Sequence, residues 1–189
     1  MALEMKGEYA LAVQQTELWR LLNDPDVLAK IIPGCNTVRL VGIDCYEMGL
    51  KLQVGSVSGE YMGSVAIFDK QEPLHYVLTV EGQGSIGFMK GSAAFDLEAQ
   101  GEGESLLRYA GSAEVGGVVA GVGQRVLSGV AKFLAGRFFK ALEKHIDENK
   151  KEAKGTSEAN GASEAKGPSE AKGPSDAKDP SEAKDASAA

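Results

Sequence analysis

The side chains that most often carry out catalysis are few in this chain, and their spacing matches no familiar catalytic motif. Its two histidines are His75, which follows Pro73 at the entrance of an expected strand, and His145, in the last turn of an expected helix. Neither has an evident aspartate or cysteine partner in the sequence, and a histidine near a helix C-terminus suits the helix dipole. The motifs of serine hydrolases, zinc proteases and phosphate-binding loops are absent. We therefore expect surface or capping roles for both histidines.

The acidic residues and the two cysteines also lack the arrangement of a reactive centre. GQGSIG at Gly82–Gly87 has glycine spacing loosely like that of a dinucleotide loop, but a strand-like segment follows it instead of a helix. Cys35 and Cys45 begin consecutive expected strands, so antiparallel pairing places them at opposite ends of the ladder and a disulfide is not expected. We expect no catalytic residues, no metal site and no covalent cofactor. The acids lie on turns and outward strand positions, where we expect them to be solvated: Asp24, Asp44, Glu60, Asp69, Glu81 and Asp96.

Aromatic residues are better placed for binding than for catalysis. Tyr9, Tyr61 and Tyr109 fall on the inward register of their strands, and a buried phenol needs a hydrogen-bond partner. That partner is either the backbone or the polar head of a ligand, such as a carbonyl. Trp19 lies on the first short helix and serves either as core or as a platform for a ligand.

Glycine is the unusual residue, with 24 copies. Several glycines allow a sheet to bend and a helix to approach closely, but inward glycines also leave the core without side chains. An empty void of about 300 Å³ would cost roughly 7 kcal/mol, which is comparable to the stability of a whole domain. We therefore predict an apolar cavity filled by ligand or water. The glycines concerned are Gly7, Gly59, Gly63, Gly91 and Gly111 on strands and Gly121, Gly123, Gly129 and Gly136 on the last helix.

The spacing of apolar residues along the chain predicts the strands and helices that position these residues. Alternation over Leu3–Val13 predicts a half-buried strand, and two short helices follow, the first capped by Thr16 and the second ending at Pro33. After these helices, segments whose apolar residues alternate onto one face predict five or six antiparallel strands. Over Val118–His145 the period becomes helical. The predicted fold is α+β, with a curved antiparallel sheet of six or seven strands around a long C-terminal helix.

Bulk composition limits the partners and the compartment. The chain of 189 residues has a net charge of −7, and its Lys and Arg residues form no evident stripe. A nucleic-acid partner is therefore not expected, and attraction to anionic lipid is disfavoured. The N-terminus is unlike a signal peptide, and no run approaches the ~20 apolar residues of a membrane span. We expect a cytoplasmic protein.

The composition changes sharply near Asn149. From Ser157 the amino-acid sequence repeats every six residues, as in SEAKGP. From Lys150 to the end there is no large apolar residue. Such a segment has nothing to bury against its ordering entropy, and Pro168, Pro174 and Pro180 interrupt any helix. We predict a folded domain over 1–149 and a disordered tail over 150–189.

Several segments together resemble one known family. LWRLLNDPDVLAKIIPGC at Leu18–Cys35 is followed in order by VGSVSGEYMGSVAI, GFMKGSAAFDL, GGVVAGVGQRVL and the RFF of Arg137–Phe139. The ordered set, which spans roughly residues 3–146, resembles the G subunit of carbon monoxide dehydrogenase, a member of the START-like (SRPBCC) helix-grip superfamily.

The resemblance implies a helix-grip cavity without a catalytic centre. It also implies recruitment of the molybdenum-containing carbon monoxide dehydrogenase to the inner face of the cell membrane, and binding of a lipoquinone, menaquinone or ubiquinone, that accepts its electrons. Family tails often end in a membrane-binding segment, whereas this sequence stops at DASAA. Either the sequence is truncated there or the peripheral membrane contact uses other surfaces.

Three functions remain open at this stage. The first is a carrier of a quinone-like lipid, and the second is a docking adaptor whose cavity is only a by-product of packing. The third, an enzyme that uses the cavity, lacks a convincing set of reactive groups. For the carrier, register on strands and helix predicts these cavity residues: Trp19, Val54, Tyr61, Gly63, Val65, Leu78, Phe95, Tyr109, Val122, Val126 and Phe133.

Overall fold

The computed structural model describes residues 1–54 and 57–158, and within them the side chains of all except 54, 57 and 153–158. The chain begins with one strand and two short helices, continues through six strands, and ends in a short 3-10 helix and a long α-helix. In order these are β1 (Ala2–Leu11), α1 (Gln15–Leu22), α2 (Pro25–Ile31), β2 (Cys35–Gly42), β3 (Cys45–Val54), β4 (Val57–Gln71), β5 (His75–Gly84), β6 (Gly87–Ala99), β7 (Ser105–Gly116), η1 (Val118–Val122) and α3 (Gln124–Glu158).

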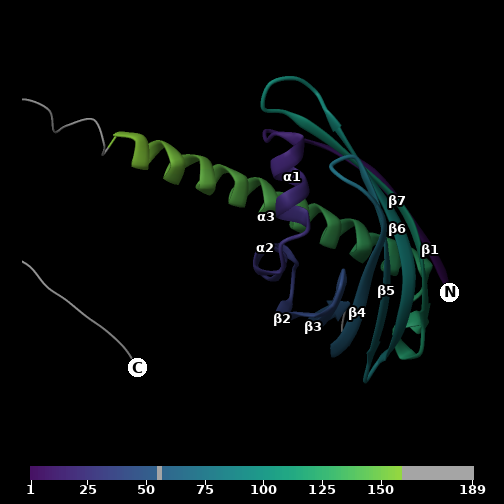
Figure 1. Ribbon diagram of the computed structural model, residues 1–189. Coiled ribbons are helices and arrows are strands. Elements are labelled where there is room, and N and C mark those ends of the chain that lie inside the picture. Colours follow the sequence, from purple (N-terminus) through teal and green to yellow (C-terminus); the bar gives the residue numbers. More distant parts are fainter. Residues whose placement is uncertain (55–56, 159–189) are drawn as a thin grey trace, which may run out of the picture.

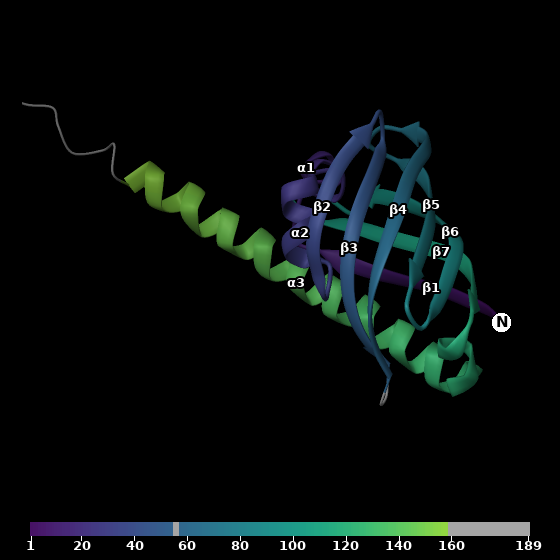
Figure 2. The same cartoon turned by 90° about the horizontal axis from the view of Figure 1, so that it is seen from below.

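The strands form one seven-stranded antiparallel sheet in the order β1-β7-β6-β5-β4-β3-β2. The sheet curves, and α3 crosses its concave side together with α1 and α2 (Figure 1). The view from below shows how the strands wrap around the helix (Figure 2). The predicted fold class, including the two short helices after the first strand, is confirmed.

The alternating sequence of the strands determines which face is buried. On β3, Tyr46 and Met48 are buried while Glu47 between them points outward. On β1, Leu3 and Leu11 are buried at the two ends. The period-two pattern therefore predicted the inward face correctly.

The two short helices begin differently from one another. Asp24 caps α2, because its carboxylate accepts from the backbone amides of Asp26 at 2.9 Å and Val27 at 3.4 Å. The prediction that Thr16 caps α1 is wrong, since the helix already begins at Gln15, two residues earlier than predicted, and its N-cap residue Gln14 makes no side-chain cap bond.

The long C-terminal helix is interrupted at its start and continues further than predicted. Gly123, with φ +89, separates the 3-10 turn η1 from α3, so the single predicted helix over Val118–His145 is wrong. At its other end α3 continues to Glu158. The predicted boundary after residue 149 is therefore too early. Glu, Lys and Ala are good helix formers and extend a helix that packing has already nucleated. The rest of the predicted tail, 159–189, lies outside the described residues.

The two cysteines lie apart and are both free. In the β2–β3 ladder Cys35 pairs with Leu50, while Cys45 pairs with Gly42 at the opposite end. The expected absence of a bond between them follows from this register.

Candidate ligand-binding cleft

The hydrophobic core consists of two separate clusters at the two ends of the space between the sheet and α3. The larger cluster includes Trp19, Leu97 and Leu107 and the later part of α3 from Phe139 onward. The smaller one consists of Leu3, Val115, Val119 and Leu127. Because β1 contributes Leu11 to one cluster and Leu3 to the other, the clusters are separated along the strands.

Between the clusters, the inward face of β1, β7, β6 and β5 is made of half-buried residues, many of them small. Ala93 pairs with Gly111, and Gly91 pairs with Ala113, on β6 and β7. None of the inward residues in this band is fully buried, although they lie on the concave face. The band, as we call it below, comprises Met5, Gly7, Leu78, Val80, Gly82, Gly91, Ala93, Gly111 and Ala113.

The helix does not seal the band. On α3 no residue between Leu127 and Phe139 is fully buried, whereas both of these residues are. The helix thus packs tightly at both ends of this stretch and loosely in the middle. We call the space between the band and this stretch of α3 the hollow; it is bordered by half-buried side chains.

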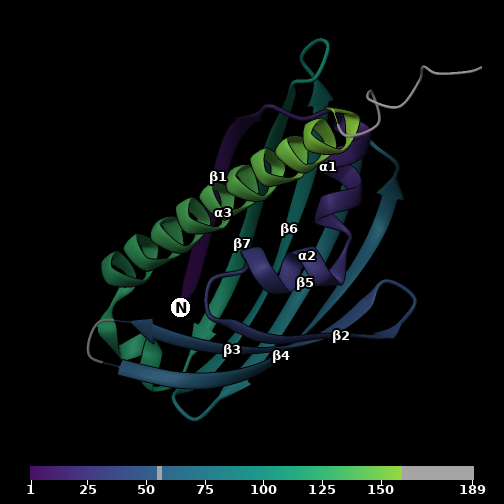
Figure 3. The same ribbon diagram turned by 90° about the vertical axis from the view of Figure 1, so that its left-hand side faces the viewer.

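A cleft of about 610 Å³ lies between the same stretch of α3 and the end of β3. The β2–β3 ladder ends at the pair of Cys35 with Leu50, and the Lys51 amide donates to the carbonyl oxygen of Gly34 at 2.8 Å just beyond it. Figure 3 shows the end of β3 facing the first half of α3, with α2 beside it. The apolar lining includes Leu52, Val126, Val130, Phe133 and Leu134, and the polar lining includes Lys51, Gln53 and Arg137.

Among the described residues, two cations and no carboxylate line this cleft. Lys51 comes from β3 and Arg137 from α3. The Arg137 guanidinium lies 5.7 Å from the centre of the Phe133 ring, which is within the range of a cation–π contact. The mouth of the cleft therefore favours an electron-rich or anionic head group over a cationic one.

A row of aromatic rings bounds the hollow on the side of the larger cluster. Ring centres of Tyr76 and Phe95 are 5.0 Å apart, and those of Phe95 and Tyr109 are 6.1 Å apart. Phe139 of α3 stacks on Tyr9 at 3.7 Å. Burial raises the pKa of the Tyr109 phenol, so this group stays protonated and can donate a hydrogen bond.

The predicted cavity residues fall into different places in the structure. Trp19 and Val65 lie in the larger cluster as core. Leu78, Phe95 and Tyr109 pack against that cluster from the hollow, and Val122 packs against the smaller one. Val126 and Phe133 line the cleft and are 44% and 61% exposed. Tyr61 is half-buried with its ring over Gly84, and the side chain of Val54 lies outside the described residues.

Gly63 is inward as predicted but is a poor position for filling the hollow. It pairs with Gly82, and a Cβ at Gly63 would stand 2.9 Å from the carbonyl oxygen of Glu81. A side chain there would push on the sheet backbone. Gly129 on α3 lines the cleft and has open space at its Cβ position, so it is the better site.

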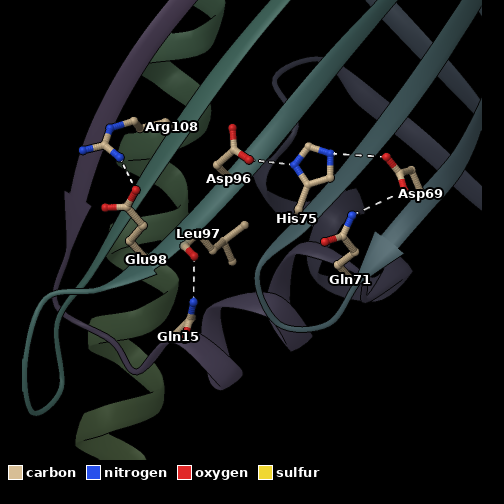
Figure 4. Close-up of polar contacts among 8 residues, drawn as sticks. All are labelled: Gln15, Asp69, Gln71, His75, Asp96, Leu97, Glu98 and Arg108. Atoms are coloured by element: carbon tan, nitrogen blue, oxygen red, sulfur yellow. Dashed lines mark hydrogen bonds and ion pairs between the residues drawn. The ribbon is translucent and has the colours of Figure 1, made fainter.

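One polar cluster was missed by the sequence analysis. His75 Nδ1 lies 2.6 Å from Asp96 Oδ1, and its Nε2 lies 3.7 Å from Asp69 Oδ2 (Figure 4). The expectation that His75 lacks an aspartate partner is therefore wrong. Register explains the contact, because His75 pairs with Asp96 across β5 and β6. None of the three residues lines the cleft.

His145 also differs from its predicted role. It lies well inside α3, which continues to Glu158, so it does not cap the helix. Its Nε2 is 3.3 Å from Nδ2 of Asn149. In the parts of the chain that the structure describes, no group of His, Cys, Asp and Glu is suited to hold a metal ion. Over the same residues, no helix combines the length and apolar character required to cross a bilayer.

The curved sheet around a long C-terminal helix is a START-like fold. The chain is similar to a START superfamily protein from Mycobacterium smegmatis, with a TM-score of 0.60 and 14% identity over 77% of this chain and 97% of that one. It is also similar to the Zhui aromatase/cyclase from Streptomyces sp. R1128, with a TM-score of 0.58 and 12% identity over 78% and 94% of the two chains. At these identities the similarity concerns the fold alone.

The family follows from closer sequence similarity. The family model of the carbon monoxide dehydrogenase G subunit (CoxG) matches residues 7–147. The chain therefore belongs to the CoxG family, as its motifs predicted. It is also 39% identical to a conserved protein from Geobacillus kaustophilus, with a TM-score of 0.74 over 77% of this chain and 96% of that one. No curated protein matches the chain.

Proposed function

We propose that this protein is a non-catalytic accessory protein of molybdenum-containing carbon monoxide dehydrogenase. It holds a hydrophobic, quinone-like lipid in the hollow under α3 and links the enzyme to the quinone pool of the membrane. The observation that carries the proposal is the half-buried band of small residues between two sealed clusters. A core built only for stability would fill that band with large side chains.

The size and chemistry of the cleft suit such a ligand. Its volume of about 610 Å³ lies within the range of roughly 300–1,000 Å³ for small-molecule sites. An isoprenoid tail would contact the band and the aromatic row. Its carbonyl head would accept hydrogen bonds from Lys51 and Arg137 at the mouth, or from the protonated phenol of Tyr109 inside.

The family supports the partner and the place that we propose. The matched family is named for a component of carbon monoxide dehydrogenase, and a component that carries a lipid must meet both the enzyme and a bilayer. We therefore place the protein in the cytoplasm, at the inner face of the cell membrane. The lipid would be menaquinone or ubiquinone, held without a covalent bond.

The test is native mass spectrometry of protein purified without detergent, followed by solvent extraction and identification of the lipid. We expect one quinone for each protein chain. Gly129→Leu fills the cleft and should abolish the bound lipid. Gly136→Leu is the matched control, because it makes the same change on the same helix, also into open space, but outside the cleft lining. An empty wild-type protein that is fully folded would contradict the proposal.

A docking adaptor without a ligand is the second candidate. It is favoured by the tip of the β2–β3 hairpin, where Leu40, Val41 and Ile43 are 61%, 55% and 94% exposed. Exposed apolar groups of this kind often mark a protein contact. The adaptor predicts that Gly129→Leu keeps both dehydrogenase binding and electron transfer to quinone. The carrier predicts that binding is kept and transfer is lost.

A further inference from the structure

The outer face of α3 gathers cations and exposed apolar side chains along its first half. Arg125 and Lys132 are seven residues apart, as are Gly129 and Gly136, and Val126, Phe133 and Lys140 continue the same spacing. At 100° for each residue, all of these positions and Arg137 fall within about 140° of the helix circumference. All are exposed, so they form one face, which we call the basic face. Its members are Arg125, Val126, Gly129, Lys132, Phe133, Gly136, Arg137 and Lys140.

The basic face carries four positive charges that have no ion-pair partner among the described residues. No Asp or Glu occurs anywhere in residues 116–142, although the chain as a whole has a net charge of −7. Its four cations take no part in the ion pairs formed by the described residues. The sequence-based expectation that Lys and Arg form no stripe is therefore wrong for this helix. The cations are scattered in the sequence, and only the helical repeat brings them onto one face.

Exposed apolar side chains lie among these cations. Phe133 is 61% exposed and Val126 44% exposed, and Val118 in the preceding η1 is 67% exposed. Gly129 and Gly136 leave the helix backbone accessible between them, with open space at both Cβ positions. A helix that combines Lys and Arg with Phe and Val on one accessible face is suited to the interface of an anionic bilayer.

The basic face is continuous with the cleft. Val126, Phe133 and Arg137 belong to the face and also line the cleft. A bilayer against the basic face would therefore lie at the mouth through which a water-insoluble ligand must pass. A second copy of the chain would bring like charges together, so self-association through this face is disfavoured.

We propose that the basic face of α3 binds the surface of an anionic phospholipid bilayer and directs the cleft toward it. This deepens the proposed function and rests on it only for the origin of the ligand. Each cation near an anionic surface contributes about fivefold in affinity. Removal of two cations should therefore weaken vesicle binding by about 25-fold.

The experiment uses the full chain and vesicles of phosphatidylcholine, with or without phosphatidylglycerol, in a sedimentation assay at low and high salt. The test variant is Arg125→Gln/Lys132→Gln, because neither residue lines the cleft. The matched control is Lys6→Gln/Lys30→Gln, which removes two exposed cations from β1 and α2. We expect binding only to the anionic vesicles, its loss in high salt, a large loss in the test variant and little change in the control.

Three results would overturn the proposal. One is equal binding to neutral and anionic vesicles, and another is an equal loss in the control variant. The third is no vesicle binding at all, combined with a loss of dehydrogenase binding in the test variant, which would assign the face to an acidic protein surface. Solvent extraction of the same samples separates this proposal from the proposed function. Vesicle binding without bound quinone refutes only the proposed function. Bound quinone without vesicle binding refutes only the proposal that the basic face binds the bilayer.

Discussion

The ring of Tyr109 lies directly on the backbone of Gly7. The Cε1 and Oη atoms of Tyr109 are 2.8 Å from the position that a Cβ on Gly7 would occupy, and the two residues pair across β1 and β7. Tyr109 in turn stacks on Phe139 of α3, with ring centres 5.7 Å apart. A single missing side chain thus allows the aromatic row to extend from the sheet to the helix.

We expect Gly7→Ala to destabilise the domain, because the added methyl group displaces the Tyr109 ring. Overpacking of this kind typically costs about 1–3 kcal/mol, measurable by denaturant unfolding. Gly82→Ala is the control, since Gly82 has nothing within 4 Å of its Cβ position. Its free energy of unfolding should stay the same or rise slightly. Equal losses in the two variants would contradict the role of the Tyr109 contact.

The aspartate that caps α2 should contribute measurably to stability. Asp24→Ala removes the acceptor of the Asp26 and Val27 amides, and loss of such a cap costs about 1 kcal/mol. Asp26→Ala removes a first-turn carboxylate that accepts neither bond, so it should cost only a few tenths of a kcal/mol, about the size of a dipole effect. Thermal unfolding of both variants measures the difference. A larger loss for Asp26→Ala would refute this assignment.

Tyr76 should make the domain sensitive to alkali. Burial raises the pKa of its phenol above the ordinary value of 10.0, so the unfolded chain loses this proton at a lower pH than the folded chain. The resulting stabilisation is full below about pH 10 and is lost as the pH rises further. We expect the free energy of unfolding to fall above that pH, and to fall less steeply in Tyr76→Phe.

Some of this dependence should remain in the Tyr76→Phe variant. Burial also raises the pKa of Tyr46, Tyr61 and Tyr109. Urea unfolding at a series of alkaline pH values gives the slope for each protein. If the wild-type and variant slopes coincide, Tyr76 does not contribute.

The cations at the cleft mouth should select the head group of the ligand. Lys51→Gln and Arg137→Gln should each weaken binding of a long-chain carboxylate by about three- to tenfold. Binding of an uncharged hydrocarbon probe should change little. Lys132→Gln is the control, because it removes a cation from the same helix without touching the cleft lining. Isothermal titration measures all of these affinities, and equal losses for both probes would argue against a head-group role.

The sequence predicted the faces of the strands better than the position of the hollow along them. Alternation places Val65 and Leu78 inward, and both are inward, but Val65 lies in the sealed core while Leu78 is half-buried. A period of two reports which side of the sheet a residue faces. It does not report where along the strand α3 approaches closely, because that depends on packing between distant segments.

Two other features depend on information that a local pattern does not contain. The contact of His75 with Asp96 requires the register of β5 and β6. The end of α3 at Glu158 was missed because a change in composition near Asn149 was equated with the end of the helix. Helix propensity carries α3 beyond its last apolar contact, since Ile146 is the last buried residue among the described side chains of α3.

Past Ile146, α3 continues as a helix without burying any further described side chain against the domain. Twelve residues separate Ile146 from Glu158, and at a rise of 1.5 Å for each residue they extend the axis by about 18 Å. Figure 1 shows this part of the helix projecting beyond the sheet. With the basic face on a bilayer, the helix axis runs parallel to the membrane plane. The end of the helix that the sheet does not cover would then lie along the membrane surface, to one side of the cleft mouth.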